Sequence, residues 1–564
     1  MKHLRWQALI AILGLLLAVG LLSRQARVLT IREVPVEGTG VYVEAMVGAP
    51  RALNPLLDHF NPVDRDLDRL LFSGLTRFDA AGRPVDDLAN WFIAADGLTY
   101  TFILKPDLTW HDGQPLTADD VAFTIELMQA TSWPGPEDLK QLWQSVTVAV
   151  TGTQTIALTL PEPFAPFLDY TDFGVLPRHQ LDGTTAAQLP QAGFNLQPVG
   201  SGPFVFDGWQ AEAGRVTGLT LKPFAAYYGA QPKLSALEFR FYADSASALA
   251  AYRNGEVLGL SQVSGTAFDT ALKLPSLRLY STLQPEYTLI FLNLRDETLP
   301  FFKEKKVRQA LSLGLNRPGL VSTVLAGQAV VANSPVLPGS WAYNRELPTP
   351  RFNPTEAAAL LDSAGWLLPP DALPGTDAYV RQKDGVPLQF TLITPDDPEH
   401  RAVADSARTT WAALGVAVTV IPAEAAALRS QFLEPRAFQA ALVDFSLAGT
   451  PDPDPYPLWH QTQVESGQNY GGWDDRISSQ LLEQARITTD IGARARLYQQ
   501  FQSRFADQVP ALLLYYPVYN FAVDAQVGGV QLGPLTQASD RFASLNEWYM
   551  VTAKVVVEQA TPTP

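Results

Sequence analysis

The chain has 564 residues, with 41 Lys plus Arg against 57 Asp plus Glu and a net charge of −16. This acidic balance argues against nucleic acid as a partner, because a phosphate backbone is bound by basic surface. The absence of cysteine excludes disulfides, thiolate metal sites and a cysteine nucleophile. The length and the apolar fraction of 47% indicate two or three lobes, each with a core.

The two ends of the chain carry separate signals. Lys2 and Arg5 precede an apolar run over residues 8–22, so we expect residues 1–27 to be a signal peptide or an N-terminal membrane anchor. The cleavage pattern after this run is poor, which favours an uncleaved anchor with the body outside the membrane. Residues 557–564 are polar and proline-rich, and we predict a disordered tail there.

A strand and a capped helix are the first elements with a clear pattern. Residues 99–104 alternate as in a half-buried strand. Thr117 and Asp120 form a variant capping box ahead of a predicted helix over residues 118–130. Because Asp119 and Asp120 fall in the first turn, where the helix dipole favours negative charge, we interpret both as capping residues rather than acid/base catalysts.

The rest of the chain alternates strands with helices. Asp244 and Asn353 are predicted N-caps, and Gly365 is a predicted C-cap. The order strand, helix, strand between residues 388 and 420 predicts a parallel crossover unit. We predict helices over residues 66–71, 245–253, 317–325, 354–364 and 401–414, and strands over residues 237–241, 388–392 and 416–420.

The usual catalytic signatures are missing. The sequence has no GxSxG, HExxH or P-loop motif, and its six histidines form no spaced pair. His111 lies in a turn, and we interpret it as a structural hydrogen-bonding residue; Asp452-Pro453-Asp454 reads as a rigid loop rather than a calcium loop. We therefore expect no cofactor and no metal. Carboxylate pairs that are distant in sequence leave an anchored extracellular hydrolase as an alternative.

Five ordered segments resemble a known family. They are DGLTYTF with WHDGQPLTADDV (residues 96–121), PVGSGPF (198–204), VRQALSLGLNR (307–317), FNPTEAAALLDSAGW (352–366) and PDPDPYPLWH (451–460). Their sequence and order resemble the family 5 extracellular solute-binding proteins, the peptide- and nickel-type receptors of ABC importers. The resemblance extends over nearly the whole chain.

This resemblance implies an α/β fold of the type II periplasmic-binding-protein kind, with two lobes, a hinge and a cleft. Lobe I would comprise residues 28–57, 197–285 and 520–556, with an inserted subdomain over residues 58–196. Lobe II would comprise residues 286–519. The chain would cross between the lobes near Gln284-Pro285 and Val518-Tyr519.

The implied function is that of a receptor on the extracytoplasmic face of the cell membrane. A monomer would capture an oligopeptide or a similar small solute by hinge closure. It would deliver the solute to an ABC permease with separate ATPase subunits, since this chain has no P-loop. An oligosaccharide receptor of the same fold and a sensor that signals to a partner are the alternatives within the family.

The resemblance also places candidate ligand contacts. In peptide-binding relatives an aspartate before the DPD segment pairs with the ligand's ammonium group, and the corresponding residue here is Gly449. Asp444 or Asp452 is the candidate replacement, because a buried ammonium needs a carboxylate; without one, an oligosaccharide becomes the better ligand. The predicted ligand-binding residues are Arg51, Asn54, Ser264, Gly265, Asp444, Phe445, Ser446, Gly449, Asp452, Trp459 and Tyr470. For Trp459 and Tyr470 ordinary packing is the alternative.

Overall fold

The structure, a computed structural model, describes residues 29–35, 40–449 and 452–558. The N-terminal segment predicted over residues 1–27 lies outside these residues, as does most of the predicted tail. Residues 557 and 558, predicted to belong to that tail, are instead the end of strand β23 (Tyr549–Glu558), which pairs with β1 (Leu29–Pro35). In the described ranges, no helix is both long and apolar enough to cross a bilayer.

One mixed sheet of twelve strands runs through the molecule. Its main order is β19-β18-β20-β14-β21-β12-β2-β11-β10-β9, with β13 and β15 also paired to β21. The pairs β2–β11, β2–β12, β18–β19 and β18–β20 are parallel. The strands are β2 (Val41–Val47), β9 (Phe204–Glu212), β10 (Arg215–Pro223), β11 (Ala236–Tyr242), β12 (Gly259–Leu260), β13 (Leu277–Leu283), β14 (Glu286–Leu292), β15 (Ala329–Val331), β18 (Gln389–Pro395), β19 (Ala417–Ala423), β20 (Ala440–Ser446) and β21 (Ala511–Asp524).

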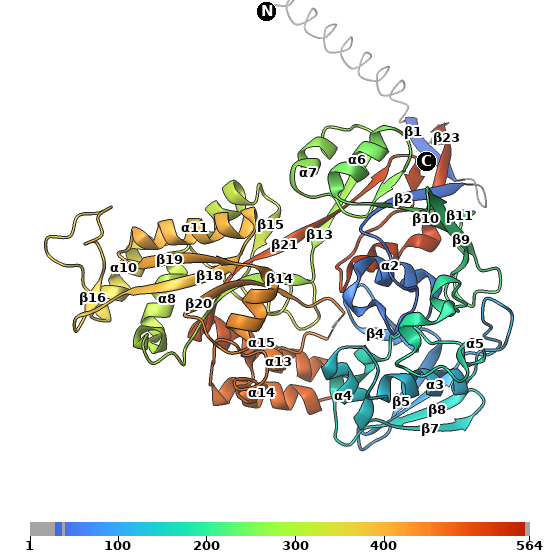
Figure 1. Cartoon of the computed structure of the whole chain (residues 1–564), viewed down its shortest axis with the longest axis horizontal. Coiled ribbons are helices and arrows are strands. Elements are labelled where there is room, and N and C mark those ends of the chain that lie inside the picture. The colour runs from blue at the N-terminus through green and yellow to red at the C-terminus, as the bar shows by residue number, and fades with distance from the viewer. Residues whose placement is uncertain (1–28, 36–39, 450–451, 559–564) are drawn as a thin grey trace, which may run out of the picture.

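The long strand β21 joins the two halves of this sheet (Figure 1). Its first half pairs with β14 and β15 up to Pro517, and its second half pairs with β13 from Val518 onward. The residues Gln284 and Pro285 separate β13 from β14. The chain therefore crosses between the halves at these two places, next to the predicted positions.

The inserted subdomain carries its own antiparallel sheet, in the order β5-β6-β8-β7. Its strands are β5 (Ala89–Ile93), β6 (Thr99–Leu104), β7 (Thr147–Gly152) and β8 (Thr155–Thr159), with a hairpin of β3 (Thr76–Phe78) and β4 (Pro84–Asp86). Its helices are η1 (Asp58–Phe60), α2 (Pro62–Leu71), α3 (Ala118–Gln129), α4 (Glu137–Ser145), η2 (Ala165–Tyr170), α5 (Arg178–Leu181), η3 (Leu189–Gln191) and η4 (Gly193–Leu196).

The remaining helices flank the large sheet. Those of lobe I are α6 (Ser245–Arg253), α7 (Gly265–Ala271), η9 (Ala538–Phe542) and η10 (Leu545–Glu547), beside the short strand β22 (Val527–Gly528). Those of lobe II are η5 (Pro300–Lys303), α8 (Lys305–Leu313), α9 (Arg317–Gly319), η6 (Leu320–Val324), α10 (Pro354–Ser363), α11 (Pro398–Ala412), α12 (Ala425–Ala427), η7 (Leu428–Leu433), α13 (Tyr456–Trp459), η8 (Gln461–Gln463), α14 (Arg476–Ile487) and α15 (Ile491–Gln508), with the hairpin β16 (Gln382–Lys383) and β17 (Val386–Pro387).

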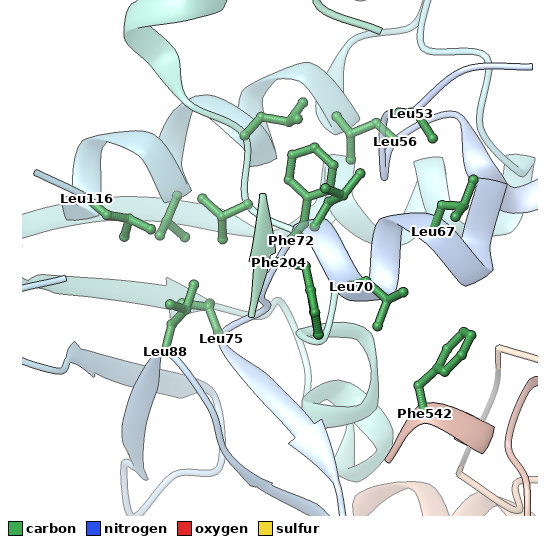
Figure 2. Packing of buried hydrophobic residues seen from close by; sticks show 14 of the residues in the cluster. Leu53, Leu56, Leu67, Leu70, Phe72, Leu75, Leu88, Leu116, Phe204 and Phe542 are labelled. Carbon is green, nitrogen blue, oxygen red and sulfur yellow. The ribbon is translucent and has the colours of Figure 1, made fainter. Parts of the chain in front are cut away.

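The hydrophobic cores divide along the same line. The largest cluster combines residues 42–239 with residues 519–548, while two further clusters contain only residues 287–516. Figure 2 shows Leu67 and Leu70 of α2 close to Phe204 of β9 and Phe542 of η9. Helix α2 is thus fixed against lobe I by burial, and its polar face has a defined position. The exact lobe boundaries remain a proposal, and we keep lobe I, inserted subdomain and lobe II as names.

Most predicted elements are confirmed. Strand β6 and helix α6 have the predicted bounds, and Asp244 caps α6 by accepting a hydrogen bond from Ser247 N at 2.7 Å. Strands β18 and β19 are parallel with α11 between them, as the crossover prediction requires. Several boundaries were wrong. Helix α2, predicted over residues 66–71, starts at Pro62 because Asn61 caps it by accepting a hydrogen bond from Val63 N. Helix α11 starts earlier because Asp397 caps it, and the helix predicted over residues 317–325 changes to a wider π-turn at Leu320.

Candidate ligand-binding site

A first cavity, which we call the hinge cavity, lies beside the chain crossings and has a volume of ≈ 150 Å³. By this measure one water needs about 10–15 Å³, so the space holds on the order of ten waters. Its wall is formed by residues 81, 82, 282–285, 287, 335–340, 447, 452–455, 458 and 534–536. These residues come from lobe I, the inserted subdomain and lobe II, so lobe movement changes the shape of this cavity.

A second cavity, which we call the acidic cavity, has a volume of ≈ 300 Å³ and lies between the inserted subdomain and the loop after β20. Five of its lining residues are aspartates, against Arg65, Arg69 and His59. The lining residues are 55, 56, 58, 59, 65, 68, 69, 72, 128, 133, 136, 138, 139, 143, 169, 170, 172–174, 448, 449 and 537. Of the described residues of lobe II, Ala448 and Gly449 contribute to this lining.

The motif Asp452-Pro453-Asp454 lines the hinge cavity, and both of its carboxylates are paired with arginines. Asp452 pairs with Arg494 of α15 at 2.7 Å, with both side chains only 6% exposed. Asp454 pairs with Arg486 of α14 at 2.7 Å. Both carboxylates therefore have cationic partners within lobe II, which gives the rigid loop expected from the sequence.

Lobe II and the inserted subdomain meet at this motif. The carboxyl group of Asp169, in η2, hydrogen-bonds to Asp452, and burial followed by the charge of Asp452 raises the pKa of Asp169 well above its usual range. Beside this pair the Arg486 guanidinium lies 5.5 Å from the ring centre of Phe164. A hydrogen bond also joins lobe II to lobe I, because Gly449 N donates to Thr536 O at 3.3 Å. The lobes are thus in direct contact around the two cavities.

Asp444, one candidate for an ammonium partner, already has two partners. Thr288 Oγ1 donates to its Oδ1 at 2.5 Å, and His400 Nε2 lies 2.9 Å from its Oδ2. Burial disfavours the charged imidazole, but Asp444 and Asp397 outweigh burial and raise the pKa of His400 to about 9. Asp444 therefore forms an ion pair at neutral pH, and it lines neither cavity between the lobes.

The other predicted residues fall into three environments. Gly449 lines the acidic cavity with φ +77°, and Asp452 lines the hinge cavity. Trp459 is 1% exposed and packs on Phe505 with ring centres 4.7 Å apart, so its burial favours the packing alternative. Tyr470 lines a separate groove on lobe II.

The remaining six candidates line neither cavity: Arg51, Asn54, Ser264, Gly265, Phe445 and Ser446. Buried Asn54 donates from Nδ2 to Asn195 Oδ1 at 3.0 Å and accepts from Leu56 N at 3.0 Å, which fixes the loop before η1. Ser264 and Gly265 are exposed at the start of α7. Whether these six contact a ligand remains a prediction.

His111 has the structural role expected from the sequence. Its Nδ1 accepts from Gly200 N at 3.1 Å and its Nε2 donates to Gly202 O at 3.1 Å. Burial lowers the pKa of His111 to about 4, so the ring is neutral at physiological pH. A Cβ at Gly200 would lie 1.8 Å from Leu71 O, so this turn requires glycine. Two of the resembling segments are therefore joined by close packing rather than by chemistry.

Sequence reasoning missed the residues from the inserted subdomain, above all Asp68, Asp169 and Asp172. A signal was present in α2, whose acids Asp64 and Asp68 stand four residues apart on one face. Like charges at that spacing destabilise a helix. Two such carboxylates on a buried face therefore indicate that they interact with groups outside the helix.

The architecture of two lobes joined by crossing strands is the type II periplasmic-binding-protein fold, as in the solved structures that this chain matches. The model for "Bacterial extracellular solute-binding proteins, family 5 Middle" matches residues 84–468. The chain belongs to this family of extracytoplasmic solute-binding proteins.

Individual relatives match over most of their length. The oligopeptide-binding protein AppA of Bacillus subtilis is 29% identical over 506 residues, covering 88% of this chain and 89% of AppA. The dipeptide-binding protein of Escherichia coli is 25% identical and covers 86% of this chain and 91% of its own.

Two solved structures show the same architecture. AppA of Bacillus subtilis in complex with a nonapeptide has a TM-score of 0.68 at 27% identity, covering 92% of this chain and 100% of that one. NikZ of Campylobacter jejuni in complex with Ni(L-His) has a TM-score of 0.69 at 26% identity, covering 90% and 99%.

Proposed function

We propose that this protein captures an oligopeptide or a similar small solute between its lobes and delivers it to an ABC permease with separate ATPase subunits. The observation that carries the proposal is the hinge cavity, whose wall contains the crossing residues 282–285 and segments of all three parts of the chain. A solute in this cavity contacts both lobes at once, so closed lobes bind it more tightly than open ones.

The ligand class follows from the named relatives, which are oligopeptide- and dipeptide-binding proteins. We propose binding without catalysis, since the named relatives are binding proteins and both carboxylates of the DPD motif are held in ion pairs with arginines of lobe II. We also propose a monomeric body tethered by residues 1–27 on the extracytoplasmic side.

The proposal is tested on a soluble body comprising residues 28–564. Native mass spectrometry of the purified body should reveal a bound solute of peptide mass, and X-ray scattering should show a smaller radius of gyration with that solute than without it. An unchanged scattering curve at saturating solute would contradict capture by closure.

A cavity-filling variant localises the binding. Thr282 lines the hinge cavity, and its side chain makes no hydrogen bond to another of the residues that the structure describes. Thr282→Trp should weaken solute binding by at least about tenfold, because the indole occupies the space. Val330→Trp, at a site 47% exposed on β15 of the same sheet, is the matched control and should bind normally.

A further inference from the structure

Helix α2 carries three buried aspartates, and two of them have strong partners. Asp64 Oδ1 accepts from Arg51 N at 2.7 Å. Asp66 Oδ2 lies 2.7 Å from Arg541 Nη1 in a buried ion pair. Both carboxylates are therefore explained by the fold itself.

The third aspartate of α2 has no such explanation. Asp68 is 3% exposed and lines the acidic cavity, yet neither of its carboxyl oxygens has a hydrogen-bond partner among the described residues. Burial, followed by the charges of Asp58 and Asp64, raises the pKa of Asp68 well above its usual range, and the nearby Asn54 N–H offsets only part of this. A buried carboxyl group without partners is costly, so its presence calls for a reason.

Other acids surround the same space. Burial raises the pKa of Asp58 to about 7 and that of Asp172 to about 6. The charges of Arg65 on Asp58 and of Arg69 on Asp172 oppose this rise, and neighbouring carboxylates add to it. Of the basic groups, Arg65 donates from Nη2 to His59 O at 2.7 Å, and burial with Arg65 lowers the pKa of His59 to about 4. His59 is thus neutral, so two arginines, Arg65 and Arg69, stand against five aspartates in the lining. Arg69 interacts with Asp172 and with Asp540 and Asp87 outside the cavity, whereas neither arginine is a partner of Asp68.

The walls between the acids are aromatic. Phe72, Trp133, Trp143 and Phe173 line the cavity beside the carboxyl groups. Within the described ranges no group of three or more His, Asp or Glu side chains converges as a metal ion requires. Separate carboxylates between aromatic faces suit an organic cation on a hydrocarbon stem, since ring faces attract cations and cover the stem.

We propose that the acidic cavity is a subsite for an ammonium or guanidinium group of the captured solute, with Asp68 as its direct partner and Asp58 and Asp172 as supporting charges. The proposal deepens the receptor function proposed above and names a cationic ligand class for it. Lobe II closes this subsite through Ala448 and Gly449, where a Cβ on Gly449 would meet nothing within 4 Å. Closure therefore covers the cation without a steric obstacle at that position.

The first test uses small probes that need no peptide. n-Butylammonium and 1-butanol differ in charge but share the hydrocarbon stem, and their binding to the body of residues 28–564 is measured by ligand-observed NMR. The amine should bind to the subsite at least about tenfold more tightly than the alcohol. Asp68→Asn should remove this difference, whereas Asp119→Asn, at an exposed aspartate outside the cavity, should keep it.

The second test uses two pools of N-acetylated alanine-based tri- to pentapeptides, with one lysine or one norleucine at each position in turn, so that the lysine side chain is the only ammonium group in either pool. Native mass spectrometry should show the lysine pool bound at least about tenfold more strongly, and Asp68→Asn should abolish the preference without weakening the norleucine pool. Because asparagine keeps an acceptor oxygen towards the Asn54 N–H and removes a buried carboxyl group that lies among other acids, Asp68→Asn should fold and melt at the same temperature as the parent or higher.

The outcomes separate the two proposals. Peptides bound without lysine preference, together with equal amine and alcohol binding, overturn the cationic subsite and leave the receptor function intact. If n-butylammonium binds more tightly than 1-butanol only when Asp68 is present, and neither peptide pool binds, the subsite is supported and the peptide ligand is overturned. An amine and lysine preference that survives Asp68→Asn overturns the assignment of Asp68.

Discussion

At the scale of single residues, Arg541 is the clearest case of a side chain that fixes distant segments. Its guanidinium pairs with Glu44 of β2 and Asp66 of α2, each at 2.7 Å, and Arg541 and Glu44 are completely buried. Tyr42 OH donates to the second oxygen of Glu44 at 2.8 Å. The C-terminal segment is thereby attached to lobe I and to the helix that carries Asp68.

Removing this arginine should be strongly destabilising. Arg541→Ala leaves two buried carboxylates without a counter-charge, and we expect the free energy of unfolding to fall by about 3–5 kcal/mol. Arg295→Ala, which breaks an ion pair whose side chains are 58% and 80% exposed, is the control and should cost less than about 1 kcal/mol. Urea denaturation of both variants checks this, and equal losses would contradict the assigned role of Arg541.

At the scale of an element, the start of α3 depends on one carboxylate. Asp120 Oδ2 accepts from Thr117 N at 2.9 Å, while its Oδ1 accepts from Arg178 N at 3.0 Å. Its neighbour Asp119 is exposed. Asp120 thus joins the helix to the start of α5, which confirms capping as its role.

The two neighbouring aspartates provide a matched pair. Asp120→Ala leaves two backbone N–H groups unpaired and should lower the free energy of unfolding by about 2 kcal/mol. Asp119→Ala removes only a helix-dipole interaction and should cost about 0.5 kcal/mol. Thermal and urea unfolding measure both, and similar losses would show that Asp120 acts merely as a first-turn charge.

At the scale of the whole molecule, the contact between Asp169 and Asp452 links the inserted subdomain to lobe II. Two hydrogen-bonded carboxyl groups cannot both be ionised, so the contact holds a proton on Asp169. Arg494, Asp454 and Asp172 are the other charged groups that act on this pair. Separation of the lobes should remove Asp452 from Asp169, and we therefore expect the pKa of Asp169 to fall towards the ordinary value in an open form.

Closure should therefore depend on pH. Because the pKa of Asp169 is raised in the closed form, closure of the lobes takes up a proton. The closed form therefore becomes more favourable as the pH falls through the range between the raised pKa and the ordinary pKa of an aspartate. The chain has no cysteine, so Val150→Cys and Ile477→Cys at exposed sites accept a fluorophore pair. Energy transfer should rise from about pH 8 to about pH 5.

The control for this experiment is Asp169→Asn, which keeps a hydrogen-bond donor towards Asp452 but does not titrate. This variant should show a flatter pH dependence than the parent. A slope equal to that of the parent would assign the effect to other acids, such as those of the acidic cavity.

Much of the fold could be predicted from the sequence because its signals are local. Asp244 and Asn353 are N-caps, β6 has its predicted bounds, and the crossover of β18, α11 and β19 is parallel. Capping and side-chain periodicity act within a few residues, so they are visible in the chain itself. The five resembling segments likewise identified the family that the comparisons establish.

The surroundings of the candidate binding residues were decided only by the tertiary structure. Asp444 was a reasonable ammonium partner in sequence, but it lies beside His400, which α11 brings close. Asp68 looked like one polar residue of a helix, and only the fold buries it opposite Gly449 from a loop far along the chain. The sequence by itself determined the elements and the family, whereas charge partners and cavities depend on contacts between distant segments, which no local pattern encodes.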